Sequence, residues 1–168
     1  TAVNISQNKN KIVELIADNP DYQVGGDDEG FASIIRAGGS FNDLWIYKFN
    51  RNESGQIILD DNGVPTKAPT QVKVGNVNPD LLLGWNNNFT LNNFFLNVLV
   101  NGKFGGVAFS KTEAFLDSYG VSKRTAEARS GSTIPIDAIQ GTTKVTSINP
   151  VDYYSAIGDR NKIMEPYV

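Results

Sequence analysis

The sequence predicts a mainly β fold of antiparallel strands, with a few short helices in the loops. Two runs of about ten residues near the middle of the chain alternate between apolar and polar side chains, which is typical of β-strands. Asn occupies nineteen of the 168 positions, beside sixteen Gly and seven Pro, so turn-forming residues are frequent. The apolar runs are short, which indicates extended, turn-rich structure rather than a helical bundle.

The N-terminal part is expected to hold two strands separated by a loop. Apolar and polar side chains alternate over residues 3–6, so residues 1–16 are interpreted as the first strand. An Asn-Pro turn in residues 18–21 ends that strand. The Gly- and acid-rich residues 24–41 are expected to form a loop, and residues 44–49 (LWIYKF) a short aromatic strand.

A small hairpin is expected at residues 56–63. Its turn carries Asn62-Gly63, the preferred pair for a type I′ turn, because both residues tolerate positive φ. The Asp residues beside it do not fit a calcium loop. Aligning Gly63 with the glycine of such a loop puts Ile58 and Pro69 where the first Asp and the last Glu belong.

Residues 80–103 carry the strongest pattern, two strands around an Asn92-Asn93 turn. One face is apolar: Leu81, Leu83, Trp85, Phe89, Leu91, Phe94, Leu96, Val98 and Val100. The other is rich in Asn and contains Asn86, Asn88, Thr90, Asn97 and Asn101. A β-sandwich is the ordinary interpretation, but a transmembrane barrel hairpin has the same alternation and length. The Asn-lined face favours the barrel, whose lumen is wet, although composition leaves both open.

The C-terminal part is expected to be a long loop with short helices. Residues 110–113 (SKTE) form a capping box, and a second helix is expected over residues 123–128. Residues 129–144 are interpreted as loop. Asn149 precedes a proline at the first position of a third helix, which Gly158 ends.

Composition excludes several classes of function. The net charge is −3, so a basic nucleic-acid-binding surface is not expected. The chain has no Cys and no His, which excludes a disulfide framework, a thiolate zinc site and Ser-His-Asp catalysis. No apolar run approaches the roughly 20 residues of a transmembrane helix. We therefore expect no metal, no cofactor and no enzymatic activity.

Several segments, in order, resemble the SusC/RagA-type TonB-dependent outer-membrane transporters. Residues 74–85 (VGNVNPDLLLGW) are similar to the "IGNPNPDF…G" segment that introduces a descending barrel strand in that family. Residues 94–106 are similar to the matching ascending strand and its exit. The remaining similarities are to a strand end, a loop helix and the approach to a further strand: residues 8–13, 118–129, 157–160 and 165–168.

The resemblance implies that the chain is a fragment of one β-barrel domain in the outer membrane of a Gram-negative bacterium. Its parts would be a strand (residues 1–16), an external loop with a small hairpin (17–79), a transmembrane hairpin (80–104) and a second external loop (105–168). The apolar face of the hairpin would contact lipid, and Asn86, Asn88, Thr90, Asn97 and Asn101 would face the lumen. Asn87 on the lipid face and Phe95 on the lumen face depart from this pattern.

The resemblance also implies a function and partners. The family imports oligosaccharides, or in some members peptides, with a SusD-like lipoprotein that caps the barrel, and TonB drives it through a plug domain that this chain lacks. Contacts to substrate or to the lipoprotein are expected from four residues: Trp45, Tyr47, Lys123 and Arg124. Core packing of the aromatic residues and a solvated helix face are the simpler interpretations of the same residues.

Two other functions are alternative interpretations of the sequence. A soluble, secreted carbohydrate-binding β-sandwich would explain the alternation and the aromatic residues, but not the ordered family motifs. A polysaccharide-cleaving enzyme would need two carboxylates about 5–10 Å apart. The acidic residues 27–29 (DDE) are interpreted instead as a solvated loop.

Overall fold

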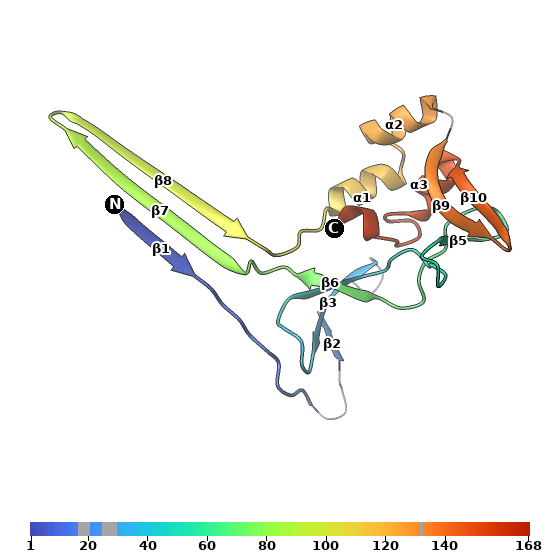
Figure 1. The fold of residues 1–168 in the computed structure, drawn as a ribbon, viewed down its shortest axis with the longest axis horizontal. Helices are drawn as coiled ribbons and strands as arrows, with labels where there is room; N and C mark the ends of the chain where they lie inside the picture. Colours follow the sequence, from blue (N-terminus) through green and yellow to red (C-terminus); the bar gives the residue numbers. More distant parts are fainter. Residues whose placement is uncertain (17–20, 25–29, 132) are drawn as a thin grey trace.

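The computed structural model describes residues 1–16, 21–24, 30–131 and 133–168, and the described chain is mainly β (Figure 1). The strands are β1 (Ala2–Ser6), β2 (Asp21–Val24), β3 (Phe31–Arg36), β4 (Asp43–Ile46), β5 (Ile57–Leu59), β6 (Val72–Asn76), β7 (Leu81–Leu91), β8 (Phe94–Phe104), β9 (Ile134–Gln140) and β10 (Thr143–Ile148). The helices are α1 (Lys111–Ser118), α2 (Lys123–Ser130), α3 (Pro150–Ala156) and a 3₁₀ turn, η1 (Glu165–Tyr167).

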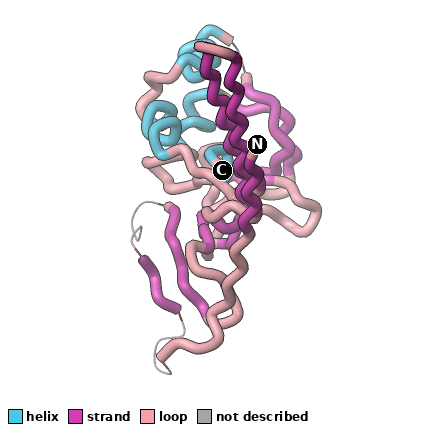
Figure 2. Tube along the Cα trace, turned by 90° about the vertical axis from the view of Figure 1, so that its left-hand side faces the viewer, coloured by secondary structure: helices cyan, strands magenta, loops and turns pink. Residues whose placement is uncertain are grey.

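The chain has two parts of different character. Strands β1, β7 and β8 form a long antiparallel sheet, here called the hairpin sheet, that projects away from the rest (Figure 1). The remaining described elements form a packed unit, here called the body. Figure 2 shows the helices grouped together on one side of the body.

The hairpin predicted for the middle of the chain is confirmed. Strands β7 and β8 pair without interruption from Leu91 opposite Phe94 to Leu81 opposite Phe104. The turn between them begins at Asn92, whose φ of 51° lies in the left-handed region that Asn tolerates. Strand β1 pairs with the other edge of β7.

The first strand is shorter than the predicted range 1–16. It ends at Ser6, where the alternation gives way to a polar run, and residues 7–16 leave the sheet. The main chain of Ile12 instead pairs with the body, accepting a hydrogen bond from Gly38 N and donating one to Gly39 O, both at 2.8 Å. The predicted turn in residues 18–21 lies almost entirely outside the described residues.

A four-stranded antiparallel sheet of order β2-β3-β4-β6 lies below the hairpin sheet in Figure 1. Strand β4 confirms the short aromatic strand. The loop expected over residues 24–41 is wrong in part, because β3 lies within it. The residues of β3 are partly covered on both faces, so the strand lacks the clear alternation that the prediction relied on.

The third sheet, of order β10-β9-β5, corrects two expectations. Strand β5 pairs with β9 in parallel, so the pairing is not antiparallel throughout. The segment 129–144 is not all loop, because it holds β9 and the start of β10. Pro135 lies within β9 opposite a register shift in β10, and a proline in a strand hides the usual sequence signal.

The turn at residues 60–63 differs from the predicted type I′. Gly63 has a φ of 80°, whereas Asn62 is not in the left-handed region. Gly63 N donates to Asp60 O at 3.0 Å, and Asp60 N donates to Val64 O at 2.9 Å. A turn closed by a left-handed glycine is the usual alternative in short hairpins.

The three helices begin where the sequence places them. The Ser110 hydroxyl accepts a hydrogen bond from Glu113 N, but the reciprocal half of the capping box is replaced, since Ser110 N donates to Tyr167 O at 3.0 Å. Helix α2 extends two residues beyond the predicted 123–128. The Asn149 side chain caps α3 by accepting from Val151 N at 2.8 Å.

The apolar core lies entirely in the body. Its largest fully buried apolar side chains are Ile46, Ile157 and Ile163. The C-terminal segment closes this core from the far end of the sequence: Met164 N donates to Tyr47 O at 2.9 Å, and Phe49 N donates to the Glu165 carboxylate at 3.0 Å. The core therefore joins residues more than a hundred positions apart.

Candidate functional site

The five residues predicted to line a lumen lie on one face of the hairpin sheet, here called the polar face. The register places Asn88 opposite Asn97 and Gly84 opposite Asn101, and directly opposed residues share a face. Asn86 and Thr90 follow by the two-residue period of the strand. The sequence alternation and the register therefore agree on this set.

The asparagines at the centre of the polar face are bonded to one another. The Asn97 side-chain amide donates to Asn86 Oδ1 at 2.7 Å and also to Asn88 Oδ1. An amide has both donors and acceptors, so such a row can bond internally and still offer groups to water or a ligand. The centre of the polar face is thus an uncharged, hydrogen-bonding surface.

Strand β1 adds to this surface a residue that the predictions missed. Asn4 lies opposite Gly84 and so joins the polar face, whereas Val3 and Ile5 oppose Trp85 and Leu83 on the other side. The alternation of residues 3–6 already contained this information. The place of Asn4 beside the hairpin could not be predicted, because a sequence does not give the pairing of distant strands.

The opposite face of the hairpin sheet, here called the apolar face, is uncovered. Phe94 is 82% exposed, and Phe89 and Leu96 are each at least half exposed. Soluble monomers rarely expose a contiguous apolar surface of this length. In the described part of the chain, no element packs over this face as a second sheet would in a sandwich.

Asn87, the polar exception on the apolar face, has a partner. The Thr1 hydroxyl donates to Asn87 Oδ1 at 2.6 Å across the β1–β7 pair. The polar face carries three exposed apolar side chains, namely Phe95 opposite Thr90, Leu99 opposite Asn86 and Leu82 opposite Lys103. The departures from strict alternation therefore include Leu82 and Leu99 as well as Asn87 and Phe95.

Trp45 and Tyr47 lie on β4 and just after it, and each carries a cation on its ring. The Arg36 guanidinium is 4.7 Å from the Trp45 ring centroid, and the Lys67 ammonium is 4.3 Å from that of Tyr47. Arg36 is also held by Asp21 at 2.5 Å, and this carboxylate raises the pKa of the guanidinium. Each of these two rings therefore has a face partly covered by a charged side chain of the body.

Arg124 stabilises the body, and Lys123 is a surface residue. The Arg124 guanidinium pairs with the buried Asp117 carboxylate and lies 5.4 Å from the Tyr167 ring centroid. The Tyr167 hydroxyl donates to the same carboxylate at 3.0 Å, and burial, followed by this negative charge, raises the pKa of Tyr167. Lys123 is exposed and pairs only loosely with Glu127, at 3.6 Å.

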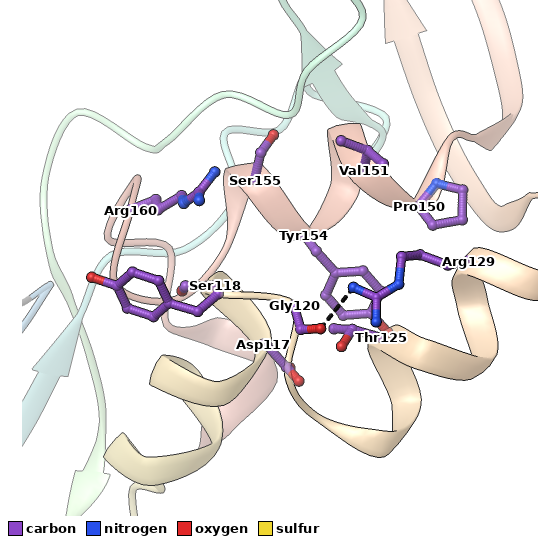
Figure 3. Close-up of a pocket in the computed structure, with 11 residues that line it drawn as sticks. Asp117, Ser118, Gly120, Thr125, Arg129, Pro150, Val151, Tyr154, Ser155 and Arg160 are labelled. Carbon is purple, nitrogen blue, oxygen red and sulfur yellow. Dashed lines mark hydrogen bonds between the residues drawn. The ribbon is translucent and has the colours of Figure 1, made fainter.

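A pocket of about 150 Å³ lies between α1, α2 and α3 (Figure 3). Arg129 reaches into it from α2, and its guanidinium donates to Gly120 O at 2.7 Å. This bond joins the end of α2 to the turn after α1, so it serves the helix packing. Within the described ranges, no three Asp, Glu, His or Cys residues are grouped as metal ligands would be.

Comparison with protein-family models and with curated proteins finds no match to the chain. Among the described helices, none is long and apolar enough to cross a membrane.

The predicted site residues divide into two groups. Five share the polar face of the hairpin sheet, whereas Trp45, Tyr47, Lys123 and Arg124 belong to the body.

Proposed function

We propose that the chain forms part of an outer-membrane β-barrel transporter of the SusC/RagA type, which imports oligosaccharides or peptides. The observation that carries the proposal is the hairpin sheet, with one face apolar and exposed and the other lined with bonded asparagines. In this arrangement the apolar face contacts lipid and the polar face lines the lumen.

The dimensions of the hairpin support this assignment. Strands β7 and β8 are each eleven residues long, and about 9–11 residues of a tilted strand cross the hydrocarbon core of a bilayer. Between Leu81 and Phe104, Lys103 is the only charged residue, and it lies at the end next to the body. A charged side chain on the lipid side near mid-membrane costs about 2–4 kcal/mol, so its absence there fits a membrane strand.

The body fits the role of external loops. It leaves the hairpin sheet at the end opposite the Asn92-Asn93 turn, so a periplasmic turn puts the body outside the cell (Figure 1). There it would meet substrate and a SusD-like lipoprotein. Its exposed Lys123 and half-buried Trp45 and Tyr47 remain candidate contacts, whereas Arg124 is engaged with Asp117.

In this role the chain supplies a part of the barrel wall and external loops that contact the substrate, without catalysis or a cofactor. Energy from TonB would reach the transporter through a plug domain elsewhere in the protein. The soluble β-sandwich is less well supported, because it needs a second sheet over the apolar face. In water, each fully exposed large apolar side chain forgoes about 1.5–3 kcal/mol of burial free energy.

Single cysteines on the two faces test the proposal, because the chain has no cysteine of its own. In the complete protein, embedded in membrane and cleared of other cysteines, Leu96→Cys and Asn97→Cys place thiols on opposite faces one residue apart. A water-soluble maleimide is expected to label Asn97→Cys and to leave Leu96→Cys unlabelled. Both should be labelled after unfolding in detergent, which controls for thiol reactivity.

Other labelling results would reject the membrane assignment. Equal labelling of both positions in the folded protein means that water contacts both faces. Protection of both means that each face is packed against protein. An exposed cysteine in the body, Ser54→Cys, should be labelled in every case and reports that the reagent reached the outer surface.

A further inference from the structure

A groove runs along the polar face where the hairpin sheet joins the body. It consists of two depressions of about 370 and 380 Å³ that share Ser6 and Leu82 as lining residues. One lies over Gly84 on the sheet, and the other reaches into the body at Phe41. We call these two adjoining depressions together the asparagine groove, since their lining includes Asn4, Asn8, Asn10, Asn42, Asn78 and Asn101.

Some asparagine side chains of the groove are hydrogen-bonded to other residues of the chain, and others are not. The body asparagines position the loop, with Asn10 Oδ1 accepting from Phe41 N at 2.7 Å and the Asn42 side chain donating to Asn78 Oδ1 at 3.3 Å. In the described part of the chain, the side chains of Asn8 and Asn101 make no hydrogen bond. Their donors and acceptors therefore face the groove unused.

Phe41 supplies an aromatic surface at one end of the groove. Its side chain is 50% exposed, although its main chain is fixed: its N–H donates to Asn10, and its carbonyl accepts from Asn76 at 2.8 Å. Because the backbone is already fixed, only the two side-chain torsions of Phe41 would have to be ordered when its ring covers an apolar ligand face.

Gly84 sets the depth of the groove on the sheet. A Cβ added there would lie 3.4 Å from Asn101 Oδ1 and 3.8 Å from the Asn4 Cβ, which is ordinary contact distance. A Cβ at Gly84 would thus fit between Asn4 and Asn101 without a clash. Any longer side chain at this position would extend into the groove.

The scarcity of charged residues in the groove indicates which class of ligand fits it. Its lining contains no carboxylate, and Lys103, at one end, is its only charged residue. Unpaired amides match hydroxyl groups, which also both donate and accept, and an exposed phenyl ring matches the apolar face of a sugar ring. The charged pockets that would select a peptide's acidic and basic side chains are not formed here, since Lys103 is the one charged residue among those that line the groove.

We propose that the asparagine groove is a binding site for an uncharged oligosaccharide, with Phe41 stacking on one sugar ring and Asn8 and Asn101 bonding hydroxyl groups. The inference rests on the proposed function for its place inside the lumen. It narrows that function to neutral glycans and assigns them residues that the sequence did not single out.

Isothermal calorimetry on the complete purified protein tests the site with three neutral probes: maltohexaose, xylohexaose and mannohexaose. At least one is expected to bind. Phe41→Ala is expected to weaken that binding about tenfold, from loss of roughly half a phenyl ring of buried area. Asn101→Ala should weaken it about threefold to tenfold, as for one hydrogen bond. Gly84→Leu should abolish it by filling the groove.

Matched controls lie on the apolar face. Phe89 is as exposed as Phe41, and Asn87 carries the same side chain as Asn101 although it is bonded to Thr1, so Phe89→Ala and Asn87→Ala should leave the affinity unchanged. The proposal is overturned if no neutral hexasaccharide binds at millimolar concentration, or if Phe41→Ala and Gly84→Leu bind as the unmodified protein does. It is also overturned if only hexagalacturonate or a hexapeptide binds.

The two proposals fail in distinguishable ways. Equal cysteine labelling of both faces removes the membrane role, whereas loss of glycan binding in the groove variants can still be measured on a soluble protein. Conversely, face-selective labelling with unaltered binding in the variants leaves the barrel and removes only the groove.

Discussion

The hairpin sheet and the body follow opposite rules of burial. In the body, large apolar side chains such as Ile46 and Ile163 are fully enclosed, whereas the hairpin sheet leaves Phe94 and Leu96 open on one face and asparagines on the other. The body is thus stabilised by its own buried apolar side chains, whereas the hairpin sheet satisfies the backbone hydrogen bonds between its strands but buries no core. The contrast shows that one chain can carry a unit that encloses its large apolar side chains and a unit that leaves them exposed.

The comparison is tested most strongly by truncating one apolar side chain in each part. Ile46→Ala is expected to lower the free energy of unfolding of the body by about 2–5 kcal/mol, because a fully buried side chain leaves a cavity. Leu96→Ala should change it in water by less than about 0.5 kcal/mol, because that side chain is 57% exposed.

The two tryptophans make this measurable region by region. Trp45 lies in the body and Trp85 in the hairpin sheet, and the chain has no other tryptophan. Urea unfolding followed by fluorescence in the Trp85→Phe background reports the body, and the Trp45→Phe background reports the sheet. Equal losses for Ile46→Ala and Leu96→Ala would contradict the contrast.

A smaller effect is expected from the buried polar contacts of the body. Asp117→Ala should cost about 1–3 kcal/mol, because the Tyr167 hydroxyl and Arg124 lose the carboxylate that joins them. Glu113→Ala removes the other carboxylate near Arg124, which is 3.8 Å away and exposed, and should cost less than about 0.5 kcal/mol. Denaturant unfolding through Trp45 measures both, and a loss as large for Glu113→Ala would reject the assigned role of Asp117.

Acid sharpens the comparison further. Burial raises the pKa of Asp43, but hydrogen bonds from Lys73, Asn76 and Ser40 outweigh it and hold this pKa below its usual range. A lowered pKa in the folded state gives stability that is fully present above the unfolded value, about 3.9, and is lost as the pH falls through the folded value. The hairpin sheet has no acidic residue, so Trp85 should not report this loss.

The variant Asp43→Asn isolates this contribution. It should cost about 1–2 kcal/mol at pH 7 and less in strong acid, once the pH lies below the lowered folded-state pKa and the wild-type carboxyl is protonated as well. Asp61→Asn, in an exposed turn, is the matched control and should show no such pH dependence. An Asp43→Asn cost that is the same at both pH values would mean that the charge of Asp43 does not contribute.

The sequence predicted the hairpin sheet better than the body, for a physical reason. Alternation over β7 and β8 determines both faces, because the two strands are adjacent in the chain and their turn sets the register. Strands β3 and β9 were missed, because one is partly covered on both faces and the other contains Pro135. Parallel pairing of β5 with β9 depends on contacts that no local pattern encodes.

The candidate site divides in the same way. The five polar-face residues were predicted from period-two alternation alone, but the asparagine groove was not, since it combines a depression lined by Asn8 and Phe41 with an adjoining one lined by Asn101. For Arg124, a surface position on a short helix gave no sign of the buried Asp117 that engages it. The acidic residues 27–29 lie outside the described part, so their expected role as a solvated loop stays a prediction.

The contacts of the C-terminal segment also determine an order of folding. Strands β7 and β8 need only each other and a two-residue turn, so they can pair as soon as both leave the ribosome. Tyr47 and Phe49 must wait for Met164 and Glu165, which are made more than a hundred residues later. We therefore expect the hairpin, with its open apolar face, to form before the body closes. In the cell, this interval is when the segment most needs protection from aggregation.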